Sequence, residues 1–260
     1  LPNLFSNITP ETIARYSSHN VNIKDTNDYY KEDIQSVDSV LLPFNTTIKF
    51  LESDKQSHLF SENNQDFLEE TGLLKTFRYN DNFLRPFSVS NCIYDLMFSS
   101  KNTKTILKYE LNYRNFFLVT QGSIKVKMIP PKSAKYLYTI KDYDNFEFRS
   151  PINVWNVQQD YKADFDKVKV LDVTLNKGEI IYIPAYWWYS FEFSENTSVS
   201  VFKYKTYMNN VAISNHLLVT MLQGQNVKRE TVKKMDKDEE CKVNNENITE
   251  NDITKEEIKD

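Results

Sequence analysis

Glycine is scarce in this chain of 260 residues, which contains only four of them. Gly72, Gly122, Gly178 and Gly224 each stand alone in the sequence. Walker-type phosphate loops and dinucleotide fingerprints need several glycines within a few residues, because their backbone must approach the phosphates closely. The isolated glycines therefore exclude nucleotide binding by either of these loops.

Cysteine and long apolar runs are equally rare. Cys92 and Cys241 are the only two cysteines and lie far apart in the sequence, which excludes a disulfide framework and a thiolate zinc site. No apolar run approaches the ~20 residues of a membrane-spanning helix, so no membrane segment is expected. The formal net charge of −4 gives no sign of nucleic-acid binding, which normally goes with an excess of basic residues.

β-Branched and aromatic residues dominate the middle of the chain. Turn residues separate runs of them that predict strands at 92–100, 103–111, 115–129, 168–185, 186–193 and 198–207. Gly122 and Gly178 each lie in a short polar stretch between two such runs, which predicts hairpin turns there. Many short strands without an intervening helical pattern predict a mainly β protein, either a sandwich or a barrel.

Helices are expected outside the strand-rich region. Thr9, Pro10 and Glu11 are typical of a helix start, and this helix would run to about Tyr16 and lead into an irregular polar arm. A second short helix is predicted over residues 63–74, with Gly72 near its end. Apolar residues at helical spacing after Lys205 predict a C-terminal helix, with Gly224 as its stop: Val211, Ile213, Leu217, Leu218, Met221 and Leu222.

The last part of the chain is rich in Lys, Glu, Asp and Asn and lacks aromatic residues. Such a segment cannot bury enough apolar surface to offset its chain entropy, so a disordered tail is expected. We therefore divide the chain into an arm with a short helix (1–41), a barrel domain (42–207), a C-terminal helix (208–225) and a charged tail (226–260). The Asn- and Lys-rich composition is typical of AT-rich genomes. Together with the absence of a signal peptide, it favours an intracellular or virion-associated protein.

Two segments carry a family signature. These are "TKTILKYELNYRNFFLVTQGSIKVKMIPP" at residues 103–131 and "LNKGEIIYIPAYWWYSFEF" at residues 175–193. In the order and identity of their motif residues, they resemble the JmjC and cupin-like 2-oxoglutarate oxygenases. The resemblance is strongest to the branch of the asparaginyl hydroxylase that inhibits the hypoxia-inducible factor. The resemblance implies a double-stranded β-helix, the jelly-roll barrel of the cupins, with flanking α-helices.

The resemblance also places the family's metal ligands. In the family, iron(II) is held by two histidines and a carboxylate. Here these positions fall on Lys108, Tyr189 and Glu110 respectively. A protonated lysine has no lone pair to offer a metal, and a phenol with a pKa of about 10 suits ferrous iron poorly. The resemblance therefore implies a degenerate metal site, and we expect no bound iron.

The cosubstrate position is changed as well. In the family, a lysine two residues after the turn glycine binds the distal carboxylate of 2-oxoglutarate, and here that position is Ile124. Lys125 and Lys127 alternate onto the opposite face of the strand, unless a one-residue bulge turns Lys125 inward. The asparagine that the family often carries on the final strand corresponds to Phe202. We therefore expect no bound 2-oxoglutarate.

Lys108 and Glu110 are two residues apart on a predicted strand, so their side chains share one face. If that face points into the barrel, the two charges must neutralise each other within about 4 Å, with the Tyr189 hydroxyl as a further partner. Alternatively, the strand is shifted and both charges lie at the solvated mouth. The residues expected to line the pocket are aromatic: Tyr109, Trp187, Trp188, Phe202 and Tyr204. Alternation places Trp187 and Trp188 on opposite faces, and residues 183–188 are expected to be buried.

Two functional hypotheses follow. The leading one is a non-catalytic cupin-like module, a pseudoenzyme that serves structure or protein interaction without iron or 2-oxoglutarate. Residues 209–223 would bind a protein partner or form a homodimer, because this helix carries more apolar residues than one buried stripe requires. The alternative is an active or atypical iron(II)- and 2-oxoglutarate-dependent hydroxylase that acts on a protein side chain. It requires Glu110 together with ligands beyond the matched positions.

Overall fold

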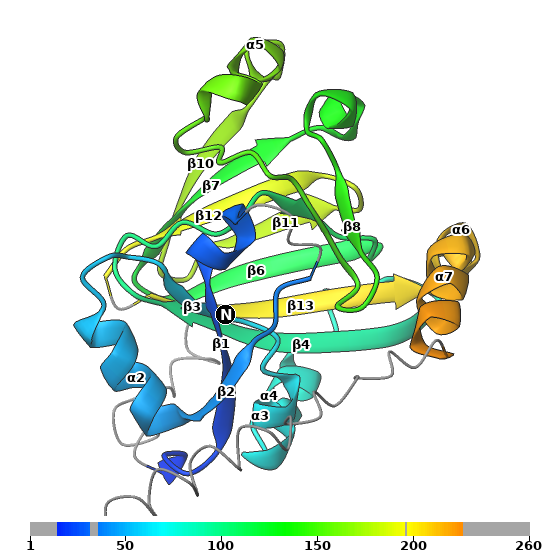
Figure 1. Cartoon of the computed structure of the whole chain (residues 1–260). Coiled ribbons are helices and arrows are strands. Elements are labelled where there is room, and N and C mark those ends of the chain that lie inside the picture. The colour runs from blue at the N-terminus through cyan, green and yellow to red at the C-terminus, as the bar shows by residue number, and fades with distance from the viewer. Residues whose placement is uncertain (1–14, 32–35, 196, 226–260) are drawn as a thin grey trace, which may run out of the picture. The chain divides into compact units, whose positions relative to one another are not determined.

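Strands form the body of the molecule (Figure 1). The computed structural model describes residues 15–31, 36–195 and 197–225. Within these ranges, a large antiparallel sheet has the seven-strand order β11-β6-β13-β4-β3-β1-β2, and a smaller one has the six-strand order β10-β7-β12-β5-β9-β8. The large sheet comprises β1 Asn20–Asp25, β2 Val40–Pro43, β3 Leu59–Ser61, β4 Val89–Ser99, β6 Arg114–Gln121, β11 Ile180–Pro184 and β13 Ser198–Thr206. The smaller sheet comprises β5 Lys108–Tyr109, β7 Ser123–Ile129, β8 Ile140–Asp142, β9 Glu147–Arg149, β10 Leu171–Asn176 and β12 Trp188–Phe193.

The two sheets share one apolar interior. Val199 and Val201 of β13 pack in the same buried cluster as Val126 of β7 and Phe191 of β12. Side chains alternate between the two faces of a strand, so these strands place every second side chain in the interior between the sheets. The mainly β fold predicted from the sequence is confirmed, with two facing antiparallel sheets as expected of a double-stranded β-helix.

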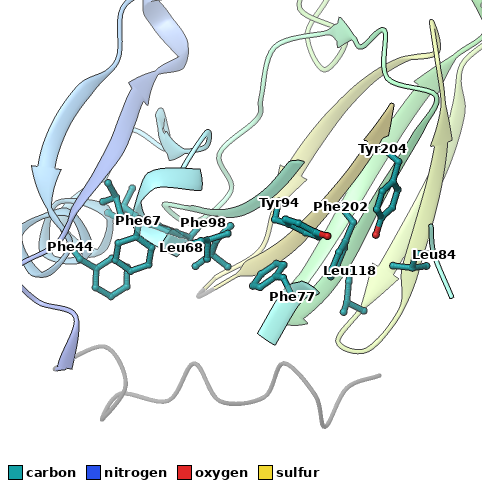
Figure 2. Packing of buried hydrophobic residues seen from close by; sticks show 13 residues of the cluster. Phe44, Phe67, Leu68, Phe77, Leu84, Tyr94, Phe98, Leu118, Phe202 and Tyr204 are labelled. Atoms are coloured by element: carbon teal, nitrogen blue, oxygen red, sulfur yellow. The ribbon is translucent and has the colours of Figure 1, made fainter. Parts of the chain in front are cut away.

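Helices cover the other face of the large sheet. They are α2 Phe44–Ser53, α3 Gln65–Glu70 and α4 Leu74–Asn80. Figure 2 shows Phe44 and Phe67 of the helices beside Phe98, and Phe77 beside Tyr94 and Phe202 of the sheet. Each fully buried side chain of this size contributes about 1.5–3 kcal/mol, so this second cluster fixes the helices on the sheet.

The turns at Gly122 and Gly178 and the second helix lie where the sequence predicts them, but the prediction that these turns close hairpins is wrong. β6 and β11 belong to the large sheet and β7 and β10 to the smaller one, so each turn joins the two sheets instead of two paired strands. Gly122 joins β6 to β7 with a φ of 71°, and Gly178 joins β10 to β11 with a φ of 89°. Gly72, with a φ of 75°, follows the end of α3. These left-handed conformations are favourable for glycine, because it has no Cβ to clash with the backbone.

The segment predicted as an arm contributes a strand instead. β1 pairs with β2 and with β3 in the large sheet, and its Val21 is only 1% exposed. The sequence of this strand is polar, so its alternation is weak, and hydrogen bonds from both neighbours decide its conformation. A boundary at residue 42 would therefore cut through the sheet. The predicted helix at 9–16, apart from its last two residues, and the tail at 226–260 lie outside the described residues.

The C-terminal helix is divided in two. α6 spans Tyr207–Ala212 and α7 spans Ser214–Gln225, with the fully buried Ile213 between them. Thr206 caps α6, because its hydroxyl accepts a hydrogen bond from the Asn209 N–H at 3.1 Å. The predicted single helix is wrong in this respect, and Gly224 does not stop α7.

The remaining elements are short helices. They are η2 Thr26–Tyr30, η3 Pro131–Tyr136, η4 Gln159–Tyr161 and α5 Lys162–Phe165. Among the described helices, none has both the length and the apolar character needed to cross a membrane.

Candidate functional site

A polar cavity of about 210 Å³ opens where the ends of β5, β9 and β13 meet. Its lining contains three lysines and two glutamates together with aromatic side chains. The lining residues are Asn63, Ile93, 108–112, 145–148, Lys203 and Lys205. The sequence-predicted positions Lys108 and Glu110 both belong to this cavity, so their shared face points inward.

Lys108 binds a carboxylate that the sequence did not indicate. Its Nζ donates to Glu62 Oε2 at 2.6 Å, and the two side chains are 8% and 4% exposed. Glu62 follows β3 directly. Its other oxygen, Oε1, accepts from Lys24 Nζ of β1 at 3.1 Å, and Lys24 also donates to Glu147 Oε2 at 3.1 Å. Four buried charges therefore form one continuous chain.

Glu110 forms a second group of contacts. Its Oε1 accepts from the Tyr189 hydroxyl at 2.6 Å and forms an ion pair with Lys203 Nζ at 2.8 Å. Its Oε2 accepts from Asn112 Nδ2 at 2.6 Å. The backbone is held as well, because the Tyr186 N–H donates to the Glu110 carbonyl at 2.9 Å. The predicted contact between Tyr189 and Glu110 is confirmed.

The electrostatics of the site follow from burial and pairing. Burial alone would raise the pKa of Glu62, but Lys108 and Lys24 outweigh it and hold that pKa below its usual range. Burial would likewise raise the pKa of Glu110, and Lys203 and Lys108 lower it overall. Burial and the negative charge of Glu110 hold the pKa of Tyr189 well above its usual range, so the phenol stays protonated. Both carboxylates therefore stay ionised at neutral pH.

The pairing expected between Lys108 and Glu110 is wrong. Among the ion pairs of the described residues, none joins these two side chains, and each has its own partner. Two charged side chains on the same face of a strand need not pair with each other, because residues of other elements can pair with each of them. Here Glu62, directly after β3, is the partner of Lys108, and Lys203 of β13 is the partner of Glu110.

Of the five aromatic residues expected to line the pocket, only Tyr109 does so. Phe202 and Tyr204 face the helices, where the Tyr204 hydroxyl donates to the buried Asp81 at 2.9 Å. Trp188 packs behind the smaller sheet, whereas Trp187 packs on the apolar interior, so the predicted opposite faces are confirmed. Within 183–188, burial holds for Ile183 and Trp188, whereas Tyr186 is 39% exposed.

The cosubstrate position lies inside the barrel. Ile124 is 1% exposed in the apolar interior. Lys125 points outward, where it pairs with Glu192 at 3.0 Å, and β7 keeps a regular register with β10 and β12. The bulge that would turn Lys125 inward is absent from this strand, so no lysine of β7 reaches the interior.

Sequence reasoning missed Glu62, Lys24, Lys203 and Glu147. A signal for Lys203 was available, because alternation puts it on the same face as the inward Val199 and Val201. For Glu62 and Lys24 there was none, since both lie in short polar strands or at their ends. Their role follows from sheet pairing alone.

The donor set does not fit the iron that the family resemblance implies. Across the part of the chain that the structure describes, no three His, Cys, Asp or Glu side chains gather as metal ligands. At the three positions of the family's metal ligands, the ammonium group of Lys108 pairs with Glu62. The protonated phenol of Tyr189 and the ammonium group of Lys203 both bind the third position, Glu110. Iron(II) needs neutral imidazole or carboxylate lone pairs at those positions.

The sequence matches the cupin-like domain family over residues 7–210. Over 88 residues it is 28% identical to HSPB1-associated protein 1 of Rattus norvegicus and of Homo sapiens, which is 34% of this chain and 18% of each relative. Over 152 residues it is 27% identical to the lysine-specific demethylase JMJ31 of Arabidopsis thaliana, which is 56% of this chain and 27% of that protein. These alignments thus span less than a third of each relative.

The family match covers most of the chain and includes both signature segments, the two facing sheets and the cavity. The described strands β4 to β13 all fall within it. The two relatives are consistent with the same assignment, since one of them is named as a demethylase. This protein belongs to the cupin-like domain family and carries a JmjC-type cupin-like domain.

Proposed function

We propose that this domain is a non-catalytic member of its family that serves as a protein-interaction module. The observation that carries the proposal is the environment of Glu110, the one retained residue of the metal-ligand type. Its oxygens are engaged by Lys203, Tyr189 and Asn112, at 2.8, 2.6 and 2.6 Å. A metal ion could bind this carboxylate only after displacing an ammonium group.

Charge adds to this obstacle. Lys108 and Lys203 both line the cavity, and two unit charges 4 Å apart interact by about 4 kcal/mol at an effective dielectric constant of ~20. A divalent cation in the same space would be repelled by both ammonium groups. The buried, paired lysines therefore act against iron binding rather than merely failing to support it.

An exposed apolar surface supports the interaction role. On α6 and α7, Tyr207, Met208, Val211, Leu218 and Met221 are 66%, 76%, 68%, 56% and 63% exposed. Contiguous apolar surface is typical of protein interfaces, and the exposed apolar side chains of these two successive helices make them the candidate for one. The name of HSPB1-associated protein 1 describes that relative as associated with another protein, which is in line with an interaction role. We propose that α6 and α7 form a homodimer interface.

Iron-loading and turnover assays test whether the domain has lost iron binding and catalysis. Purified protein is incubated anaerobically with Fe(II), desalted, and assayed for bound iron and for conversion of 2-oxoglutarate to succinate. We expect neither stoichiometric iron nor succinate above a no-protein blank. Iron that binds the wild-type protein and is lost in Glu110→Gln would contradict the proposal.

Light scattering tests the interface. We expect a dimer at micromolar concentration for the wild type and a monomer for Val211→Glu combined with Leu218→Glu. As a matched control, Phe50→Glu changes an apolar side chain on α2 that is 49% exposed, and it should remain dimeric. A monomeric wild type at the same concentration would remove the homodimer from the proposal.

A further inference from the structure

Lys205 differs in its ion pairing from the other lysines in and around the polar cavity. Lys24, Lys108 and Lys203 each form an ion pair. By contrast, no acidic side chain of the described residues lies within ion-pair distance of Lys205, whose ammonium instead lies 5.4 Å from the centre of the Phe146 ring. It is partly buried, so water compensates its charge incompletely.

The geometry of β13 directs this lysine into the cavity. Lys203 and Lys205 share one face of the strand, and both line the cavity. Directly after Lys205, the pairing of β13 with β4 shifts register. Irregularities of this kind often lie beside functional sites, where they redirect a side chain.

Glu147 supplies an unused acceptor in the same cavity. Its Oε2 accepts from Lys24 at 3.1 Å and from the Tyr29 hydroxyl at 3.4 Å. Its Oε1 is buried and has no hydrogen-bond partner among the described residues, and the side chain as a whole is 10% exposed. A buried carboxylate oxygen without a donor costs free energy, and a bound molecule with an N–H group would remove that cost.

The remaining walls combine asparagines with apolar and aromatic side chains. Ile93, Leu111 and Phe146 line the cavity, and Tyr109 stacks on Phe148 with ring centres 5.2 Å apart. The volume of about 210 Å³ corresponds to roughly seven water molecules at ~30 Å³ each. This space suits a molecule about the size of one amino acid.

We propose that the polar cavity binds a free α-amino acid with an apolar or aromatic side chain. The carboxylate of the ligand pairs with Lys205, its ammonium group donates to Glu147 Oε1, and its side chain lies against Phe146 and Tyr109. Lys205 thereby gains a partner of opposite sign, and Glu147, which already pairs with Lys24, gains a donor for its second oxygen. This proposal goes beyond the non-catalytic role, and iron assays neither support nor contradict it.

Three ligands with the same ring test the proposal by isothermal titration calorimetry. L-Phenylalanine carries both charged groups, 3-phenylpropionate lacks the ammonium group, and 2-phenylethylamine lacks the carboxylate. We expect L-phenylalanine to bind about tenfold or more tightly than either of the others, because each charge-assisted hydrogen bond contributes at least that factor. No binding of L-phenylalanine at millimolar concentration, or equal affinities for all three, would overturn the proposal.

Substitutions in the cavity test which residue binds each charged group of the ligand. Lys205→Met should weaken L-phenylalanine about tenfold and leave 2-phenylethylamine unchanged, whereas Lys205→Arg, which keeps the charge, should retain binding. Glu147→Gln should weaken L-phenylalanine and leave 3-phenylpropionate unchanged. Lys177→Met, at an exposed turn, is the matched control and should bind like the wild type. Unchanged affinity in Lys205→Met, with a wild-type melting temperature, contradicts the assignment.

Discussion

Glu62 is the residue on which the charges inside the barrel converge. Each of its oxygens accepts from a different lysine, Lys24 or Lys108, and it is 3% exposed. Removing one partner of a buried ion pair leaves an uncompensated charge in a medium of low dielectric constant, which is far more costly than removing a surface pair. The three side chains therefore form one unit whose members contribute unequally.

The first prediction concerns this inequality. Glu62→Gln leaves Lys108 without its carboxylate and Lys24 with Glu147 alone, and we expect a loss of about 3–5 kcal/mol in the free energy of unfolding. Lys108→Met leaves Glu62 paired with Lys24 and keeps an apolar stem in place, so it should cost less, about 1–3 kcal/mol. Urea denaturation measures both.

The exposed pair between Lys101 and Glu195 provides the control. Its side chains are 59% and 64% exposed, so Glu195→Gln should change stability by about 0.5 kcal/mol or less. A loss in Lys108→Met as large as that in Glu62→Gln would mean that Lys24 does not compensate Glu62 as the distances indicate.

The second prediction concerns acid. The lysines around Glu62 and Glu110 hold the pKa of both groups below the unfolded value, although burial opposes this shift. At pH values between the folded and unfolded pKa, the unfolded chain binds more protons, so the free energy of unfolding falls as the pH falls. The stability from these groups is complete above about pH 5 and is lost as the pH drops further below about 4. Asp95, whose pKa burial raises, opposes part of this loss.

Urea midpoints measured from neutral pH down to about pH 3 check this sign. Glu62→Gln, which removes one of the titrating groups, should show a shallower decline than the wild type. Stability that stays constant or rises on acidification would contradict the pairing of these carboxylates with lysine.

At the scale of elements, alternation along β13 decides what each face of the large sheet does. Its inward residues form the interior and then the cavity, with Val201 followed by Lys203, whereas Phe202 and Tyr204 pack under the helices. A shift of one residue would exchange the two faces, so this register fixes which side chains can reach a ligand.

The third prediction concerns the turn between β6 and β7. A Cβ at Gly122 would lie 2.9 Å from Thr197 Cα and closer still to Thr197 Oγ1, at a φ of 71°. Gly122→Ala should therefore cost about 2–4 kcal/mol, from backbone strain and steric overlap together. Thermal or urea unfolding measures the loss.

Gly72 separates these two effects. It has a φ of 75°, and nothing lies within 4 Å of the position of its Cβ. Gly72→Ala should thus show the backbone penalty alone, about 1 kcal/mol. Equal losses in the two variants would show that the contact with Thr197 relaxes without cost.

At the scale of the whole molecule, the large sheet depends on the first part of the chain. β1 lies between β2 and β3, its Val21 is buried, and its Lys24 binds both Glu62 and Glu147. The predicted boundary at residue 42 separates these contacts. The N-terminal segment therefore belongs to the same cooperative unit as the strands that follow it.

The fourth prediction tests this dependence. A chain that begins at Leu42 should lose cooperative unfolding, because β3 becomes an open edge and two buried glutamates lose an ammonium partner. Near-ultraviolet circular dichroism and urea titration measure it. A chain that ends at residue 225 is the control and should unfold like the full protein. Cooperative unfolding of the chain from Leu42 would mean that the arm is dispensable.

The sequence by itself determined the strand-rich architecture, the turns at Gly122 and Gly178, and the common strand face of Lys108 and Glu110. Each of these depends on local information. Alternation is set by the pleat, positive φ by the lack of a Cβ, and the family signature by residues close together in the chain.

The tertiary structure alone decided which charge binds which, and which polar segments are strands. Glu62 reaches Lys108 across 46 positions, and Lys24 reaches Glu147 across 123. The strands β1, β3, β8 and β9 have short or polar sequences and take their conformation from neighbouring strands. Ion pairing and sheet hydrogen bonding both depend on atoms that only folding brings together, and burial makes these contacts stronger than any local preference.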